Sequence, residues 1–227
     1  MTLWYKLLGV LSGLALMVVL LISSVEYVSY YKGGYFEKEY EKYEVTDAIG
    51  IEMDDLLTVT HEMMDYLKGD RADLVIYTKL QNTEREFFNT KEKRHMADVQ
   101  KLFIEAKQLR LGAIIFTVLS IGILLYFKKG YCLFYGIQWG IAVFFAFTGL
   151  LVALMVHNFN RYFTLFHHLF FNNDDWILNP KTDLLINIVP EGFFRDTAFW
   201  IAGLFLAGAI IVWSLSWFLA KRMKTGE

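Results

Sequence analysis

Four long runs of apolar residues dominate this sequence. They cover about residues 7–28, 109–127, 133–156 and 197–220. Each approaches the roughly 20 residues that a helix needs to cross about 30 Å of hydrocarbon, and none has Pro, Arg or Lys in its central part. An apolar fraction of 56% with only two prolines also argues against a soluble domain. We therefore predict an all-α membrane protein with four transmembrane helices in a single membrane domain, residues 1–227.

The first apolar run has two interpretations, a retained membrane helix or a cleaved signal peptide. It is longer than the apolar core of a usual signal peptide, and no small-x-small cleavage site follows residues 23–26. We therefore expect a retained membrane anchor.

Short basic flanks predict the orientation of the chain in its membrane. Basic residues precede the first run, occupy the link between the second and third runs and follow the fourth run: Lys6, Lys128, Lys129, Lys221, Arg222 and Lys224. By the positive-inside rule, both termini and that link face the cytoplasm. The two remaining segments, about residues 29–108 and 157–196, then face the outside. Long translocated segments largely escape the rule, so the basic residues of residues 29–108 do not contradict this orientation.

The first outer segment contains predicted helices. Residues 38–44 form a charged stretch that we expect to be solvated. Apolar residues at helical spacing predict an amphipathic helix over residues 51–67, ended by Gly69 and Asp70. A second polar helix is expected to run from Glu92 into the second apolar run without a break. The second outer segment is an aromatic-rich loop.

Several classes of chemistry lack their signatures. No GxxxxGK[ST] loop is present to bind a nucleotide, and the one cysteine, Cys132, cannot form an intramolecular disulfide. Suitable metal-ligand types occur without HExxH or another compact ligand spacing, at His95, His157, His167, Asp174 and Asp175. We therefore expect no metal, no cofactor, no nucleotide and no nucleic acid partner.

Two of the five histidines stand out by helical geometry. His95 shares a helical stripe with Val99 and Leu102, while Glu92 and Asp98 lie about one turn to either side. A histidine on an apolar face between two carboxylates is either a partly buried side chain satisfied by its neighbours or a catalytic group. Both interpretations stay open for His95.

The adjacent histidines 167 and 168 point about 100° apart around a helix, so they cannot serve one site equally. His167 aligns with an aromatic stripe that includes Phe170 and Phe171, whereas His168 aligns with Arg161 and Leu165. We predict that His167 faces inward and that His168 is a surface or interfacial residue. The alternative interpretation of the stripe is a re-entrant or interfacial helix anchored on lipid by its phenylalanines, which is compatible with catalysis.

Other polar and aromatic residues of the outer segments are candidates for orienting a histidine or binding a polar headgroup: Glu26, Glu92, Asp98, Phe170, Asn173, Asp174, Trp176, Asp183, Glu191 and Arg195. Acidic residues in an outer loop are often only solvated, and Glu191 and Arg195 have the i, i+4 spacing of a simple ion pair. Glu26 is the one carboxylate embedded in an apolar run, which favours a functional role.

Two stretches resemble a known family. They read His95-Met96-x-Asp98-Val99 and Phe166-His167-x-x-Phe170-Phe171-x-Asn173-Asp174-x-Trp176, followed by Pro180-x-x-Asp183-x-Leu185-Ile186 and Pro190-Glu191. With the four-span layout, they are similar to the DUF1461 membrane proteins of Gram-positive bacteria, a family that includes lipoprotein intramolecular transacylases. The resemblance covers nearly the whole chain.

The resemblance implies an acyltransferase that acts on a diacylglyceryl-modified lipoprotein with a free N-terminal cysteine. It would move the sn-2 acyl chain to the cysteine amino group and give a lyso-form lipoprotein, with His95 and His167 as catalytic residues. A histidine suits removal of a proton from the attacking amine, and Asn173 or a backbone N–H would hold the oxyanion. Glu92, Asp98 or Asp174 would fix the tautomer of a histidine.

Two catalytic routes and two other functions remain as alternatives. In one route a histidine is itself transiently acylated, and in the other the amine attacks directly. As a non-enzymatic alternative, the protein would be a membrane scaffold that uses its outer segments to bind partners. A small transporter is disfavoured, because the apolar runs offer few polar residues for a pathway.

Overall fold

The computed structural model describes residues 2–81 and 83–225. The chain divides into two compact units. The first unit consists of Met1–Val25, Lys107–Thr164 and Ile201–Glu227, and the second consists of Glu26–Ala106 and Leu165–Trp200. Both are predominantly helical, and each is described by itself below.

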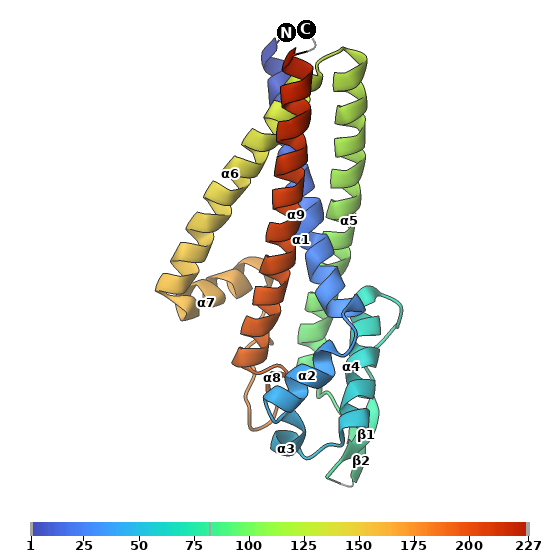
Figure 1. The fold of residues 1–227 in the computed structure, drawn as a ribbon. Coiled ribbons are helices and arrows are strands. Elements are labelled where there is room, and N and C mark those ends of the chain that lie inside the picture. The colour runs from blue at the N-terminus through green and yellow to red at the C-terminus, as the bar shows by residue number, and fades with distance from the viewer. Residues whose placement is uncertain (1, 82, 226–227) are drawn as a thin grey trace. The chain divides into compact units, whose positions relative to one another are not determined.

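Four long helices supply the first unit: α1 (Thr2–Glu26), α5 (Thr90–Tyr126), α6 (Gly130–His157) and α9 (Glu191–Thr225), labelled in Figure 1. Within the described residues these are the helices long and apolar enough to cross a membrane, which confirms the predicted four-helix membrane fold. Helix α5 has 37 residues, and all its charged side chains lie at or before Arg110. Because about 20 residues cross a bilayer, the membrane-spanning part of α5 is its apolar second half, and His95 lies outside it.

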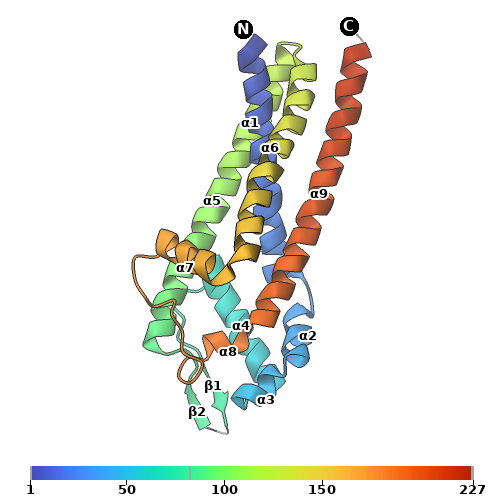
Figure 2. The same cartoon turned by 90° about the vertical axis from the view of Figure 1, so that its left-hand side faces the viewer.

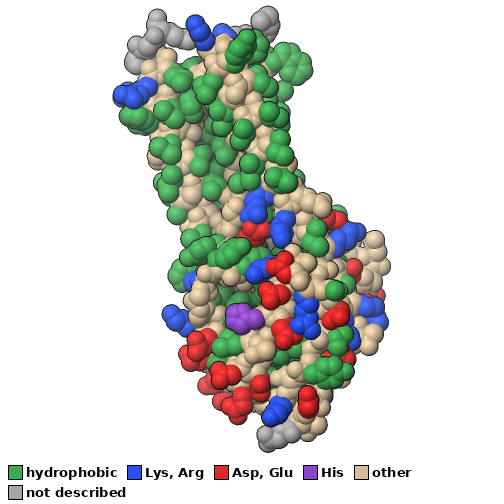
Figure 3. All heavy atoms as spheres, turned by 90° about the vertical axis from the view of Figure 1, so that its right-hand side faces the viewer, with side chains coloured by type: hydrophobic (Ala, Val, Ile, Leu, Met, Phe, Trp, Pro, Cys, Tyr) green, Lys and Arg blue, Asp and Glu red, His purple; other side chains and the backbone are tan. Residues whose placement is uncertain are grey.

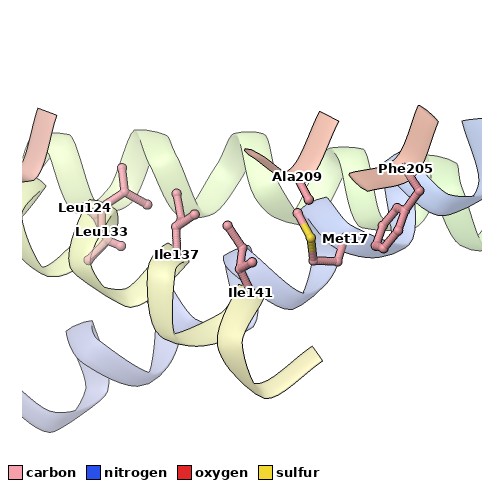
Figure 4. Packing of buried hydrophobic residues seen from close by; sticks show 7 residues of the cluster. All are labelled: Met17, Leu124, Leu133, Ile137, Ile141, Phe205 and Ala209. Atoms are coloured by element: carbon pink, nitrogen blue, oxygen red, sulfur yellow. The ribbon is translucent and has the colours of Figure 1, made fainter. Parts of the chain in front are cut away.

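The core of the first unit is built from side chains of all four helices. Figure 4 shows its buried members: Met17, Leu124, Leu133, Ile137, Ile141, Phe205 and Ala209. Most other apolar side chains of these helices face outward, and they cover the surface of this unit in Figure 3. Such an exposed apolar surface is expected where lipid is the solvent.

Helices α1 and α6 approach closely enough that glycine is required between them. A Cβ atom at Gly13 would lie 2.5 Å from the carbonyl oxygen of Ile137, and one at Gly9 would lie 2.5 Å from that of Cys132. Their counterparts on α6 are Gly136 and Gly140. Small residues that let backbones meet in this way are typical of membrane helix pairs.

The basic flanks gather at one end of the first unit. The rings of Tyr5 and Phe127 have centroids 6.0 Å apart, and the Lys129 amine lies 6.0 Å from the centre of the Tyr5 ring. Gly130 lies against the sulfur of Met223, near the end of α9. The start of α1, the α5–α6 link and the end of α9 are therefore on the same side of this unit, as Figure 2 also shows.

The second unit contains shorter elements around the first part of α5. They are the π-helix η1 (Tyr27–Tyr31), α2 (Tyr35–Lys42), α3 (Val45–Ile49), α4 (Met53–Lys68), strands β1 (Tyr77–Leu80) and β2 (Thr83–Glu86), and α8 (Leu185–Ile188). Helix α7 (Phe159–Phe170) contributes its last residues to this unit. Charged side chains gather over the second unit in Figure 3.

Two helices of the second unit confirm sequence predictions. Helix α4 matches the amphipathic helix expected over residues 51–67, and it ends at Gly69, whose φ of 86° is readily adopted only by glycine. Helix α5 runs unbroken from its polar first half into its apolar second half, as expected.

Two features of the second unit differ from expectation. Strands β1 and β2 form an antiparallel hairpin, with Tyr77 opposite Glu86 and Leu80 opposite Thr83, which the short polar sequence did not signal. The stretch 38–44 is not fully solvated, because Tyr40 is buried and hydrogen-bonds Thr60 at 2.7 Å. Glu39 beside it is also buried.

Candidate histidine site

His167 and His95 share one aromatic neighbour in the second unit. The Phe171 ring lies 5.5 Å from the His167 ring and 5.5 Å from the His95 ring, measured between centroids. The two imidazoles are therefore no further apart than twice that distance. They come from different elements, α7 and α5, and Phe171 follows directly after α7.

The two adjacent histidines of α7 have different environments. His167 is 8% exposed, whereas His168 is exposed to solvent. The Trp176 ring stacks on His167 with centroids 4.5 Å apart and an interplanar angle of 27°. It meets His168 edge-on, at 5.6 Å. This arrangement confirms the predicted helical face, with His167 turned inward.

His95 is half-buried, and its Nδ1 atom is buried without a hydrogen-bond partner. Burial lowers the pKa of His95, and His167 lowers it further. Asp98 and Asp175 oppose that shift, while Lys91 reinforces it. Because the net shift is downward, the imidazole is neutral near pH 7 and able to accept a proton.

The loop after Phe171 is bonded to the same helix that carries His95. Arg94 donates two hydrogen bonds to Asp175, each 2.8 Å long, and these bonds lower the pKa of the Asp175 carboxyl. Asn173 donates from Nδ2 to Asp98 at 2.8 Å. Asn173 or a backbone N–H was expected to hold the oxyanion, and in the structure Asp98 accepts one hydrogen bond from the Asn173 amide.

Glu92 and Asp183 hold the second outer loop to the start of α5. Glu92 is 1% exposed, and it accepts hydrogen bonds from the backbone N–H groups of Asn89 at 2.7 Å and Leu185 at 2.6 Å. Burial raises the pKa of Glu92 against these bonds. Asp183 is 3% exposed and accepts from Asn179 N and Asn89 Nδ2. The oxygens of Glu92 thus bind backbone N–H groups.

The remaining sequence candidates lie at the surface or at an element end. Phe170 is 49% exposed and packs against Phe166, with centroids 4.7 Å apart. Asp174 is exposed, as are Glu191 and Arg195 in the first turns of α9, and no ion pair between these last two is described. Glu26 is half-buried at the end of α1.

Three contributors to the site were not among the residues expected to catalyse the reaction or orient a histidine, namely Arg94, Phe171 and Asp175. Phe171 lay on the predicted aromatic stripe, but periodicity could not rank it above Phe170. Asp175 was one member of an Asp doublet, and only the structure distinguishes its ion pair from the exposed Asp174. Arg94 lies three residues after Lys91 and four before Asp98, so helical spacing alone indicates that the three side chains share a face.

No group of three or more His, Cys, Asp or Glu side chains placed to hold a metal ion occurs within residues 2–81 and 83–225. Cys132 is a free thiol in α6.

A family model described as lipoprotein intramolecular transacylase Lit matches residues 10–194. No curated protein sequence matches the chain significantly. The fold is similar to the crystallised membrane integral lipoprotein intramolecular transacylase Lit from Bacillus cereus, with a TM-score of 0.79 and 21% identity over 99% of this chain and 100% of that chain.

Two variants of the same Bacillus cereus protein match equally well. One carries a histidine-to-arginine substitution and has a TM-score of 0.80 and 21% identity, covering 99% of this chain and 95% of that chain. The other carries a histidine-to-alanine substitution and has a TM-score of 0.79 and 21% identity, covering 98% and 96%. These likenesses concern the fold.

Proposed function

Because the chain belongs to the lipoprotein intramolecular transacylase family, and is thus a multi-pass membrane enzyme acting on lipoproteins, we propose that it transfers the sn-2 acyl chain of a diacylglyceryl-cysteine to that cysteine's α-amino group. The ester C–O bond to the glyceryl group breaks, and an amide C–N bond forms. The glyceryl oxygen gains the proton that the amine loses. The product is a lyso-form lipoprotein with one O-linked and one N-linked acyl chain.

The family assignment favours an enzyme over the scaffold and transporter alternatives. Conversion of an ester to an amide is downhill, so the reaction needs no nucleotide. Its substrate is expected to be a diacylglyceryl-modified lipoprotein whose N-terminal cysteine is free. Neither nucleic acid nor a metal cofactor enters this scheme.

The mechanism rests on one observation, which is that the imidazoles of His95 and His167 both contact the ring of Phe171. We assign His95 as the general base, because its lowered pKa keeps it neutral and its Nδ1 atom has no partner. His167 would polarise the ester carbonyl or protonate the departing glyceryl oxygen. General acid and base groups of this kind each contribute about 10²–10⁴-fold to a rate.

Direct attack by the amine is the simpler of the two routes. It needs no covalent intermediate, since acyl donor and acceptor belong to one substrate and are already close. An acyl-histidine route would require one ring to act as nucleophile, which the same geometry permits. Trapping of an acylated histidine distinguishes the two routes.

The outward face of α7 supports a lipid-bound substrate. Leu165, Phe166, Leu169 and Phe170 are exposed on the helix that carries His167. An amphipathic helix of this kind lies at the boundary between headgroups and acyl chains, where glyceryl esters are found. Membrane lipid is thus an expected partner, and α7 would bring the ester to His167.

The basic flanks support an extracytoplasmic site. Because they gather at one end of the first unit, the positive-inside rule would assign that end, and both termini with it, to the cytoplasm. Segments 29–108 and 157–196, which carry both histidines, are then outside, where processed lipoproteins present their amino groups.

Mass spectrometry of lipoprotein N-terminal peptides tests the reaction. Cells that lack other N-acyltransferases and express this chain should yield peptides with one N-acyl and one O-acyl group. If well-expressed protein leaves only the unchanged diacylglyceryl form, the proposal is wrong. Reporter lipoproteins with defined sn-1 and sn-2 chains establish which acyl group moves.

A further inference from the structure

One face of α5 contacts four residues of the loop that follows α7. Lys91, Arg94, His95 and Asp98 stand at i, i+3, i+4 and i+7, so they share a helical face. In the same order they contact the Ile177 carbonyl oxygen, the Asp175 carboxylate, the Phe171 ring and the Asn173 amide. The loop is thus attached to the helix at four points around His95.

This attachment determines where Trp176 lies. Its two sequence neighbours, Asp175 and Ile177, are both bonded to α5, and Trp176 stacks on His167. The turn is stiffened further, because Asp175 N donates to Asn173 Oδ1 at 3.0 Å and Ile177 N donates to the Asp174 carbonyl at 3.1 Å. Movement of Asp175 would therefore displace the ring that packs on His167.

The same contacts determine the charge around His95. The described groups that act on its protonation are Asp98 and Lys91 on α5, His167 on α7 and Asp175 in the loop. Arg94 forms a bidentate ion pair with Asp175 and so neutralises one of the two carboxylates. Removal of either partner leaves the other charge uncompensated beside His95.

We propose that Arg94 and Asp175 are positioning residues for the transacylation, holding Trp176 against His167 and balancing the charge next to His95. This inference rests on the proposed roles of the two histidines. Neither residue touches the reacting atoms. Both act through the imidazole rings of His95 and His167.

The two halves of the pair have opposite electrostatic effects. Arg94→Gln leaves the Asp175 carboxylate unpaired, which stabilises the protonated imidazole and raises the pKa of His95. Asp175→Asn leaves the Arg94 cation unpaired, which lowers that pKa. Both variants lose the bidentate contact that holds Trp176 on His167, so both should reduce kcat by about twofold to tenfold, the loss expected when that stacking contact is removed.

The experiment measures kcat and KM against pH for the full-length protein in lipid nanodiscs, with a synthetic diacylglyceryl lipopeptide that has a free N-terminal cysteine. The acidic limb of the kcat profile should move to higher pH in Arg94→Gln and to lower pH in Asp175→Asn, with KM changed less than about twofold. Arg94→Lys keeps the charge but not the planar fork, so kcat should fall while the limb stays in place.

Lys101→Gln is the matched control. Lys101 lies on the same helix, its side chain is 75% exposed, and its described ion pair is with Glu105 at 3.9 Å. Its removal should leave the rate and the limb unchanged. If the limb does not move in opposite directions in the two test variants, the inference is wrong.

A direct titration separates this inference from the proposed function. NMR of ¹³C-labelled imidazoles, with His95 assigned through its own substitution, reports the His95 pKa without any turnover. If the His95 pKa shifts in opposite directions in Arg94→Gln and Asp175→Asn but His95→Ala keeps full activity, only the catalytic role of His95 is refuted. If His95→Ala is inactive but neither ion-pair variant shifts the His95 pKa, only the role of the ion pair is refuted.

Discussion

The indole of Trp176 stacks on the imidazole of His167, with ring centroids 4.5 Å apart and an interplanar angle of 27°. The contact joins the end of α7 to the loop that follows it. The indole limits the rotation of the ring that we assign to polarise or protonate the ester. Its effect is therefore expected on kcat rather than on substrate binding.

Replacement of Trp176 by Ala should lower kcat by about twofold to tenfold, because an aromatic pair contributes about 0.5–1.5 kcal/mol. Trp176→Phe keeps a stacking ring and should retain most of the activity. The control is Trp200→Ala, since Trp200 packs under Lys32 and has no described contact with either histidine. Equal losses in the Phe and Ala variants would contradict a stacking role.

The pH dependence of the reaction follows from His95. Its pKa is lowered from the ordinary value of 6.5, chiefly by burial. A general base must be neutral, so activity should persist below pH 6.5 and be lost as the pH falls through the lowered pKa. The measurement is kcat from about pH 4.5 to 8 on a soluble lipopeptide. An acidic limb centred well above 6.5 would contradict this assignment.

The close approach of α1 and α6 predicts a local stability effect. Gly13→Val places a side chain against the Ile137 carbonyl group, and overpacking of this kind costs about 1–3 kcal/mol. Thermal unfolding in detergent should show a lower Tm. Gly149→Ala is the control, because a Cβ there meets no other atom within 4 Å. A Tm for Gly13→Val equal to the control's would show that the helices separate without cost.

Sequence was sufficient for the membrane fold, because four runs of about 20 apolar residues have few other solutions. It was also sufficient for the inward face of His167, which follows from helical periodicity alone. The sequence also contains a capping pattern that marks the start of α5, which the prediction of this helix did not include. Asn89 and Glu92 hydrogen-bond each other's backbone N–H groups in the manner of a capping box.

Long-range contacts account for what sequence did not predict. The bond between Glu92 and Leu185 joins residues 93 positions apart, and the Arg94–Asp175 pair joins residues 81 positions apart. No local pattern specifies such partners. The turn that follows Phe171 places Asp175, and not Asp174, against Arg94. In this turn Asn173 accepts a hydrogen bond from the backbone N–H of Asp175.

The most direct measurement of the central claim compares His167→Ala with His168→Ala in the lipoprotein mass-spectrometric assay, at matched expression. The two residues are adjacent, but only His167 is buried, in contact with Trp176 and Phe171. We predict that His167→Ala abolishes the lyso-form product and that His168→Ala retains it. Retention in His167→Ala, or loss in His168→Ala alone, would contradict the assignment of His167 to the reaction.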